Sequence, residues 1–228
     1  QTVTVSPLPV LVPNGAVICS GSSSTISVTG ANTYAWTASP TITGPLNSNN
    51  AVVNPTVTTS YTVTGTNTGT GCTATTNVVA TVVPLPTISI SGNNTVCLGD
   101  STILTATGAD TYTWSPATGL NTTTGNSVIV KPTVTTTYTI TGTITSTGCI
   151  KSTTYVVTVN PLPVFTVPAI SICKGASGTL TASVASWYTY AWSPSAGLSA
   201  STGTSVTANP TVSSTYQVTA TNTSTSCK

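Results

Sequence analysis

The sequence contains almost no charge. Only six of its 228 residues are charged at neutral pH, four lysines and two aspartates, and it has no arginine, glutamate, histidine or methionine. A chain with so few cations cannot neutralise a row of phosphates, so nucleic acid is not expected as a partner. Without histidine there is no Ser-His or Cys-His nucleophile system, and two aspartates are too few for a calcium site or for acid–base pairs. We therefore expect neither an enzyme nor a cofactor or metal site.

Long hydrophobic runs are also lacking. The apolar stretches are short and interrupted by threonine, as in residues 77–83, so no membrane span is predicted. Apolar content is nevertheless ordinary at 38%, and with a net charge of only +2 the composition argues against intrinsic disorder. No signal peptide is visible, since Gln1 begins directly in strand-like residues, so we expect a mature product or a part of a longer chain.

One pattern occurs three times along the chain. It consists of a cysteine, a Tyr-x-Trp triplet, a proline before a Thr-rich run that ends in tyrosine, and a second cysteine. The motif Pro-Leu-Pro recurs at an even step, beginning at Pro7, Pro84 and Pro161. Such a period predicts tandem repeats at residues 10–86, 87–163 and 164–228, with residues 1–9 as the final strand of a preceding unit or a donor strand. The aromatic residues expected in the cores, with the three tryptophans again evenly spaced, are Trp36, Trp114, Trp192, Tyr61, Tyr138 and Tyr216.

Short alternating segments, rich in β-branched residues and separated by Gly, Asn and Pro, predict strands in each repeat. In the first two repeats they lie at residues 25–29, 34–37, 51–54, 60–65, 78–83, 87–91, 102–107, 111–115, 127–130, 136–143 and 152–159. No segment has a sustained helical period. Strands of this length and spacing predict an all-β protein built of sandwiches of two antiparallel sheets.

The six cysteines fall two to a repeat, at nearly the same separation in each repeat. An even number at a repeated spacing, in a chain without metal ligands, favours one disulfide within each repeat; the alternative is free buried thiols. The expected pairs are Cys19–Cys72, Cys97–Cys149 and Cys173–Cys227. Disulfides imply an oxidising compartment, so we expect an extracellular or cell-surface protein.

The two ends of the sequence are complementary. The segments that lead from Cys72 and Cys149 to the next Pro-Leu-Pro carry the last strand of their repeats, whereas only Lys228 follows Cys227. The third repeat is therefore expected to lack its final strand. An assembly strand for a neighbouring unit is expected at Gln1, Thr2, Val3, Thr4 and Val5. Either these residues complete the open sandwich of another copy, or the chain is one stretch of a longer tandem array. In both cases the expected partners are copies of the same unit, end to end.

Four motifs support a resemblance to a known class of repeats. They are Tyr112-Thr113-Trp114-Ser115-Pro116, the run from Pro132 to Tyr138, Gly148-Cys149 and Pro161-Leu162-Pro163. This pattern resembles the tandem immunoglobulin-like or PKD-like repeats of Bacteroidota-type secreted surface proteins, including adhesins of gliding motility. The resemblance implies three tandem sandwiches in a rod, a structural role in a filament or stalk, and tyrosine corners at Tyr61, Tyr138 and Tyr216.

Two further residues are candidate sites. Trp187 precedes an alternating Tyr-x-Tyr-x-Trp run and should face outward, where an indole can stack on a sugar or a neighbouring domain. It is the candidate contact if the chain is instead an adhesin module that binds glycans or abiotic surfaces. Ser101 lies in Asp100-Ser101-Thr102, which resembles the short O-glycosylation motif of such bacteria.

Overall fold

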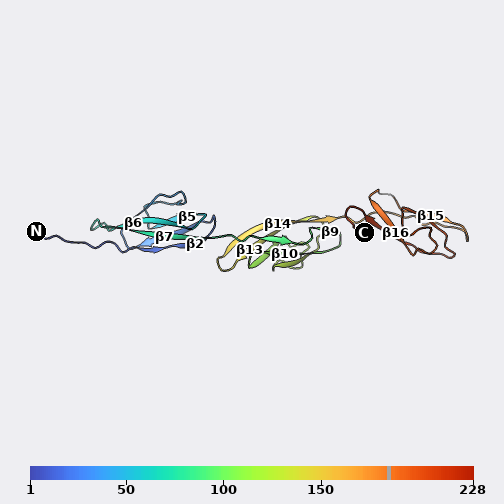
Figure 1. The fold of residues 1–228 in the computed structure, drawn as a ribbon, viewed down its shortest axis with the longest axis horizontal. Coiled ribbons are helices and arrows are strands. Elements are labelled where there is room, and N and C mark those ends of the chain that lie inside the picture. The colour runs from blue at the N-terminus through green and yellow to red at the C-terminus, as the bar shows by residue number, and fades with distance from the viewer. Residues whose placement is uncertain (184–185) are drawn as a thin grey trace. The chain divides into compact units, whose positions relative to one another are not determined.

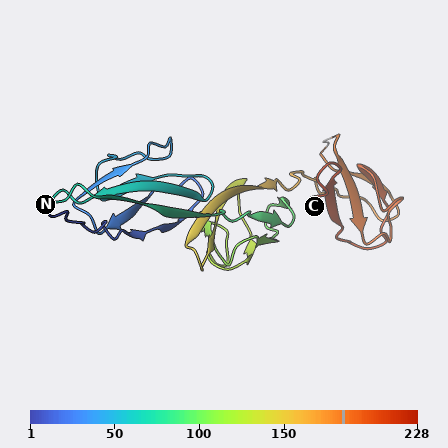
Figure 2. The same ribbon diagram turned by 60° about the vertical axis from the view of Figure 1, so that its left-hand side comes forward.

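The computed structural model describes residues 1–183 and 186–228, and these form strands, turns and loops without a helix (Figures 1 and 2). The prediction of an all-β protein is confirmed. The chain divides into two compact units. One comprises Gln1–Ser89, Ala106–Thr113 and Ile140–Thr153, and the other comprises Ile90–Thr105, Trp114–Thr139 and Thr154–Lys228. Residues of the middle repeat thus contribute to both units.

Residues 12–83 form two sheets. The first has the strand order β1 (Val12–Asn14), β3 (Ser24–Thr29), β5 (Asn50–Val53). The second has the order β2 (Ala16–Cys19), β7 (Thr73–Val83), β6 (Thr59–Thr66), β4 (Thr33–Trp36). Neighbours pair antiparallel except β2, which runs parallel to β7.

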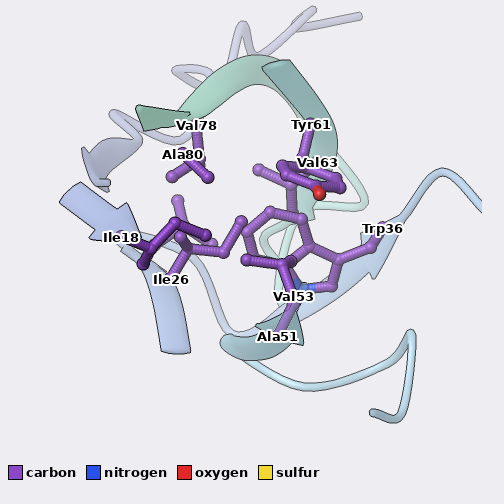
Figure 3. Close-up of a cluster of buried hydrophobic side chains, with 10 residues drawn as sticks. Ile18, Ile26, Trp36, Ala51, Val53, Tyr61, Val63, Val78 and Ala80 are labelled. Carbon is purple, nitrogen blue, oxygen red and sulfur yellow. The ribbon is translucent and has the colours of Figure 1, made fainter. Parts of the chain in front are cut away.

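Side-chain alternation makes these sheets a sandwich. Successive residues of a strand point to opposite faces, and in β6 this buries Tyr61 and Val63 while Ser60 and Thr62 stay outside that core. Both sheets contribute to one buried cluster, so they pack face to face. Figure 3 shows the Trp36 indole in this cluster, with β6 side chains on one side and those of β5 on the other. The immunoglobulin-like sandwich fold is confirmed.

Residues 89–160 repeat both sheets. One has the order β12 (Ser127–Val130), β10 (Thr102–Thr107), β8 (Ser89–Ser91). The other has the order β11 (Thr111–Ser115), β13 (Thr136–Ile144), β14 (Cys149–Asn160), β9 (Thr95–Cys97). The pairing of β9 with β14 is parallel, as is that of β2 with β7. Each element therefore has a counterpart in the first repeat.

The third repeat has fewer strands. It consists of two antiparallel pairs, β15 (Gly178–Thr181) with β17 (Ser205–Ala208) and β16 (Tyr188–Ser193) with β18 (Gln217–Asn222). By position, these correspond to β3 with β5 and β4 with β6. A core that includes Tyr190 and Trp192 lies between the pairs. In the described part of this repeat, no strand takes the place of β2 or β7.

The predicted strands of the first two repeats all occur, most of them within two residues of the expected bounds. Two begin in the wrong place: β7 begins at Thr73 instead of Val78, and β14 at Cys149 instead of Ser152. Three strands, β1, β2 and β9, were not predicted, since β1 and β9 have only three residues and the four residues of β2 are all apolar and show no alternation. Cys97 and Cys149 therefore lie at the end of β9 and the start of β14, not outside the strands as the sequence indicated.

Candidate assembly site

Two disulfides connect different repeats. Cys19 is bonded to Cys149, with their Cα atoms 5.6 Å apart, and Cys97 is bonded to Cys227, with a Cα separation of 5.5 Å. Each bond joins the first cysteine of one repeat to the second cysteine of the next. The expected pairing within repeats, Cys19–Cys72, Cys97–Cys149 and Cys173–Cys227, is therefore wrong.

Strand direction explains this connectivity. In the parallel pair of β2 and β7, Cys19 lies opposite Val83, whereas Cys72 immediately precedes the start of β7. The whole length of β7 therefore separates Cys72 from Val83, which is about 36 Å at roughly 3.3 Å per residue. A disulfide requires Cα atoms within about 7 Å, so the two cysteines of one repeat cannot meet.

The sequence held a signal for the correct pairing. Both disulfides have the same sequence separation of 130, whereas the separations within repeats differ from one another.

Cys72 and Cys173 are free thiols. Cys173 is exposed, and Cys72 is half-buried with its Sγ 3.8 Å from the Ser6 carbonyl oxygen. Cys173 begins the same turn as Cys19 and Cys97. In each turn, the backbone N–H three residues later donates to the cysteine carbonyl over 2.9 Å, and the glycine two residues later has a positive φ. The glycines are Gly21, Gly99 and Gly175, with φ of 79°, 95° and 83°.

Cys72 likewise shares its local geometry with Cys149 and Cys227. The backbone N–H of each donates to the hydroxyl of a threonine two residues earlier, over 3.3 to 3.4 Å. The two free cysteines therefore occupy the same kinds of position as the four bonded ones.

An open strand position lies in the third repeat. A cavity of about 670 Å³ is lined by residues 167–174 and 210–216, together with Leu180, Ala208 and Val218. Alignment of Cys173 with Cys19 and of Tyr216 with Tyr61 makes residues 170–173 the counterpart of β2 and residues 214–218 the counterpart of the start of β6. In the first repeat β7 lies between β2 and β6, so the cavity occupies the position of β7. Apolar side chains, including Ile170, Ile172 and Val218, line it.

The N-terminal segment, residues 1–6, forms no strand in the structure. Pro-Leu-Pro aligns it with the last strands of the first two repeats, so that Val3 corresponds to Ala80 and Val157, and Val5 to Val82 and Val159. Ala80 and Val157 are fully buried, whereas Val3 and Val5 are 88% and 89% exposed. This segment thus carries apolar side chains in the pattern of a final strand without a sheet to cover them.

The expected core tryptophans lie in the interior. The three Tyr-x-Trp tryptophans are buried, and each indole Nε1 donates to a backbone carbonyl of the same repeat. The acceptors are Ser48, Gly125 and Gly203, at 2.8 to 2.9 Å.

The expected tyrosine corners differ in their acceptors. The Tyr138 hydroxyl donates to the Thr118 carbonyl over 2.7 Å, and the Tyr216 hydroxyl likewise donates to the Ala196 carbonyl over 3.0 Å. Tyr61 instead shares a hydrogen bond with the Thr41 hydroxyl. Burial raises the pKa of the Tyr138 phenol, and a hydrogen bond with Thr136 lowers it by less.

Trp187 and Ser101 both lie on the surface. The Trp187 side chain is 57% exposed, and its ring meets that of Tyr188 edge to face at 6.5 Å. Ser101 is exposed in the turn between β9 and β10. Within the described ranges, no group of three or more His, Cys, Asp or Glu residues is placed to hold a metal ion, and no helix is long and apolar enough to cross a membrane.

No family model and no curated protein matches the sequence. A three-Ig structure of titin, in a Glu-to-Ala variant, is 16% identical with a TM-score of 0.41, and the match covers 95% of each chain. Invasin, a bacterial integrin-binding protein, is 16% identical with a TM-score of 0.39, over 95% of this chain and 56% of that one. The three N-terminal domains of the outer capsid protein Hoc of bacteriophage RB49 are 16% identical with a TM-score of 0.37, over 81% and 74%.

Proposed function

We propose that this chain is a structural unit of an extracellular filament or surface stalk, built from three immunoglobulin-like repeats that continue end to end into further copies. The observation that supports this best is the match between the open strand position of the third repeat and the N-terminal segment. The third repeat lacks a last strand, and residues 1–6 resemble the last strands of the first two repeats. The two disulfides favour an oxidising location outside the cell, as does the resemblance to Bacteroidota-type surface repeats.

Insertion of the N-terminal segment into the open strand position of the third repeat would bury apolar surface of the segment and of the cavity. Val3 would take the buried position that Ala80 and Val157 hold in the other repeats, and Val5 the position of Val82. Full burial of one such side chain contributes roughly 1.5 to 3 kcal/mol. An added strand also pairs the backbone groups that an open sheet edge leaves unpaired. The strand comes either from another copy or from continuation of the same chain.

A size measurement on the purified chain tests this proposal. We expect particles of several copies by light scattering, each copy of 22.7 kDa, and monomers after deletion of residues 1–6. The double substitution Val3→Ser with Val5→Ser should also give monomers, since both inward positions become polar. The matched control, Thr2→Ser with Thr4→Ser, changes only the outward positions and should assemble normally. Unchanged assembly of the deletion variant would refute strand donation.

Intact mass distinguishes the two routes to continuity. Separate subunits are indicated if denatured, non-reduced material from the native source has the mass of one chain, 22.7 kDa. A whole multiple of that mass that collapses to a single chain on reduction indicates the same. A reduced mass several times larger indicates one tandem chain, in which residues 1–6 are the last strand of the repeat before.

The exposed Trp187 favours a second candidate function, a surface-binding or carbohydrate-binding adhesin module without enzymatic activity. Exposed indoles stack on the apolar faces of sugars. Binding of the purified chain to polysaccharide-coated and bare mineral surfaces tests this role. Loss of retention in Trp187→Ala, with assembly unchanged, would support adhesion through this residue. Equal retention would refute it, and the structural role would be the one that remains. Ser101 is proposed as the site of an attached glycan, which the intact mass of the native material would reveal.

A further inference from the structure

The two disulfides follow one pairing pattern, and Cys72 and Cys173 are the two cysteines that this pattern leaves unpaired. The first cysteine of a repeat bonds the second cysteine of the following repeat, at a sequence separation of 130. Within residues 1–228, Cys173 is a first cysteine with no second cysteine 130 residues later, and Cys72 is a second cysteine with no first cysteine 130 residues earlier. The same separation counted onward from Cys173 leads to position 303. If a following copy continued the numbering after three Pro-Leu-Pro periods, its Cys72 would have the number 303.

Strand register leads to the same pair by a separate route. In the first repeat Cys19 lies opposite Val83, and in the second Cys97 lies opposite Asn160. Val83 and Asn160 each immediately precede Pro-Leu-Pro, as does Ser6. A donated N-terminal segment in the same register would therefore place Ser6 opposite Cys173 of its neighbour.

The last step is a contact within one chain. The carbonyl oxygen of Ser6 lies 3.8 Å from Sγ of Cys72. A strand that brings Ser6 next to Cys173 of a neighbour therefore brings Cys72 there too. From the pairing pattern and this contact together, we propose that Cys173 of one copy forms a disulfide with Cys72 of the next, which locks the end-to-end junction covalently. This inference rests on the proposed function.

The bond forms by oxidation of two thiols. The oxidant is a disulfide, of an oxidoreductase or of a small thiol compound, the same class that would form the two internal bonds. The Cys173 thiolate attacks this disulfide and releases one thiolate, and Cys72 of the neighbour then displaces the second. One S–S bond forms, one is cleaved, and the oxidant takes up two electrons and two protons. The exposed Cys173 is accessible for the first attack.

A mixing experiment with single variants tests the pairing. Cys72→Ser keeps only the Cys173 thiol free, and Cys173→Ser keeps only the Cys72 thiol free, while both internal disulfides stay in place. The intact chain, incubated with oxidised glutathione, should give a ladder of bands at multiples of 22.7 kDa on a denaturing, non-reducing gel. Each variant alone should run as a single chain. An equimolar mixture should stop at a covalent dimer that contains one of each.

Isotope labelling of one variant identifies the dimer by mass. We expect mixed dimers in at least about tenfold excess over homodimers, because strand docking raises the effective concentration of only this thiol pair to the millimolar range. Homodimers in the single-variant samples, in amounts equal to the mixed dimer of the mixture, would overturn the proposal, since they indicate random oxidation. A ladder that persists after deletion of residues 1–6 would overturn it as well, because the strand would not position the thiols.

Assembly in the presence of oxidised glutathione separates this inference from the proposed function. Particles of several copies that never form the Cys72–Cys173 bond would refute the covalent junction and leave strand donation intact. Monomers under all conditions, with deletion of residues 1–6 having no effect, would refute strand donation itself. Circular dichroism and the unfolding midpoint of each variant should match those of the intact chain, which shows that the substitutions change only the thiols.

Discussion

Single aromatic residues hold each sandwich together through one buried ring and one backbone hydrogen bond. Each Tyr-x-Trp tryptophan fills a core and satisfies its indole N–H on a carbonyl in the same repeat. Tyr138 does the same with its hydroxyl, from a fully buried position in β13. A ring that is buried but hydrogen-bonded avoids the cost of an unpaired polar group.

Substitution of Tyr138 by Phe should lower the free energy of unfolding by about 1 to 2 kcal/mol at pH 7, because the Thr118 carbonyl loses its donor. The pH dependence should also change. Since burial raises the Tyr138 pKa above about 10, the unfolded chain loses this proton at lower pH than the folded chain. The associated stability is present below pH 10 and is lost as pH rises through the folded pKa. Denaturant unfolding between pH 7 and 12 should therefore show a smaller alkaline loss in Tyr138→Phe.

The last strand is the element on which each sandwich depends. In the first repeat β7 pairs with both β2 and β6, so it fills the interior of its sheet. In the third repeat this position is open, and the segment that corresponds to β2 forms no strand. A segment such as residues 170–173 needs a neighbour to pair with before it becomes a strand.

The inward face of β14 allows a matched test of this dependence. Val157 is fully buried, whereas its neighbour Val156 is 46% exposed. Val157→Ser should destabilise the fold by about 2 to 4 kcal/mol, because it removes buried methyl groups and leaves a hydroxyl in the core. Val156→Ser should change the free energy of unfolding by less than about 0.5 kcal/mol. Chemical denaturation of both variants measures this difference. Equal effects would contradict the inward orientation of Val157 and the outward orientation of Val156.

At the scale of the whole molecule, two disulfides join neighbouring repeats covalently. Each bond ties one repeat to the next across a sequence separation of 130. In the chain-entropy model, closing a loop of this length restricts the unfolded chain more than closing a short one does. The connection between repeats therefore does not depend on the short Pro-Leu-Pro linkers alone.

Removal of one such bond should be costly. The double variant Cys19→Ser with Cys149→Ser is expected to lose roughly 4 to 5 kcal/mol of stability in the chain-entropy model. Guanidinium unfolding without reductant measures the loss as a lower midpoint. The comparison is made in the background of Cys72→Ser with Cys173→Ser, which keeps both internal disulfides and removes any bond between copies, and the midpoint of this background is the reference. If the added Cys19→Ser and Cys149→Ser substitutions leave that midpoint unchanged, the bond contributes nothing to stability.

Features that depend only on neighbouring residues, such as strand bounds and side-chain exposure, were predictable from the sequence. The bounds of β10, β11 and β12 were predicted to the residue, since strands of this length display a period of two. β9 was missed because it has only three residues, and β2 because its four residues are all apolar and show no alternation; both become strands by pairing with β14 and β7. The exposed Trp187 and the buried Tyr-x-Trp tryptophans lie where the alternation placed them.

The amino-acid sequence by itself determined the repeat, its strands, the aromatic residues of each core and the equal spacing of the cysteines that bond. The tertiary structure alone decided which cysteines meet. Alternation is a property of neighbouring residues, whereas the distance from Cys19 to any other cysteine depends on the direction in which β2 runs beside β7. A parallel pairing puts the two cysteines of a repeat a full strand length apart, so each can bond only across a junction.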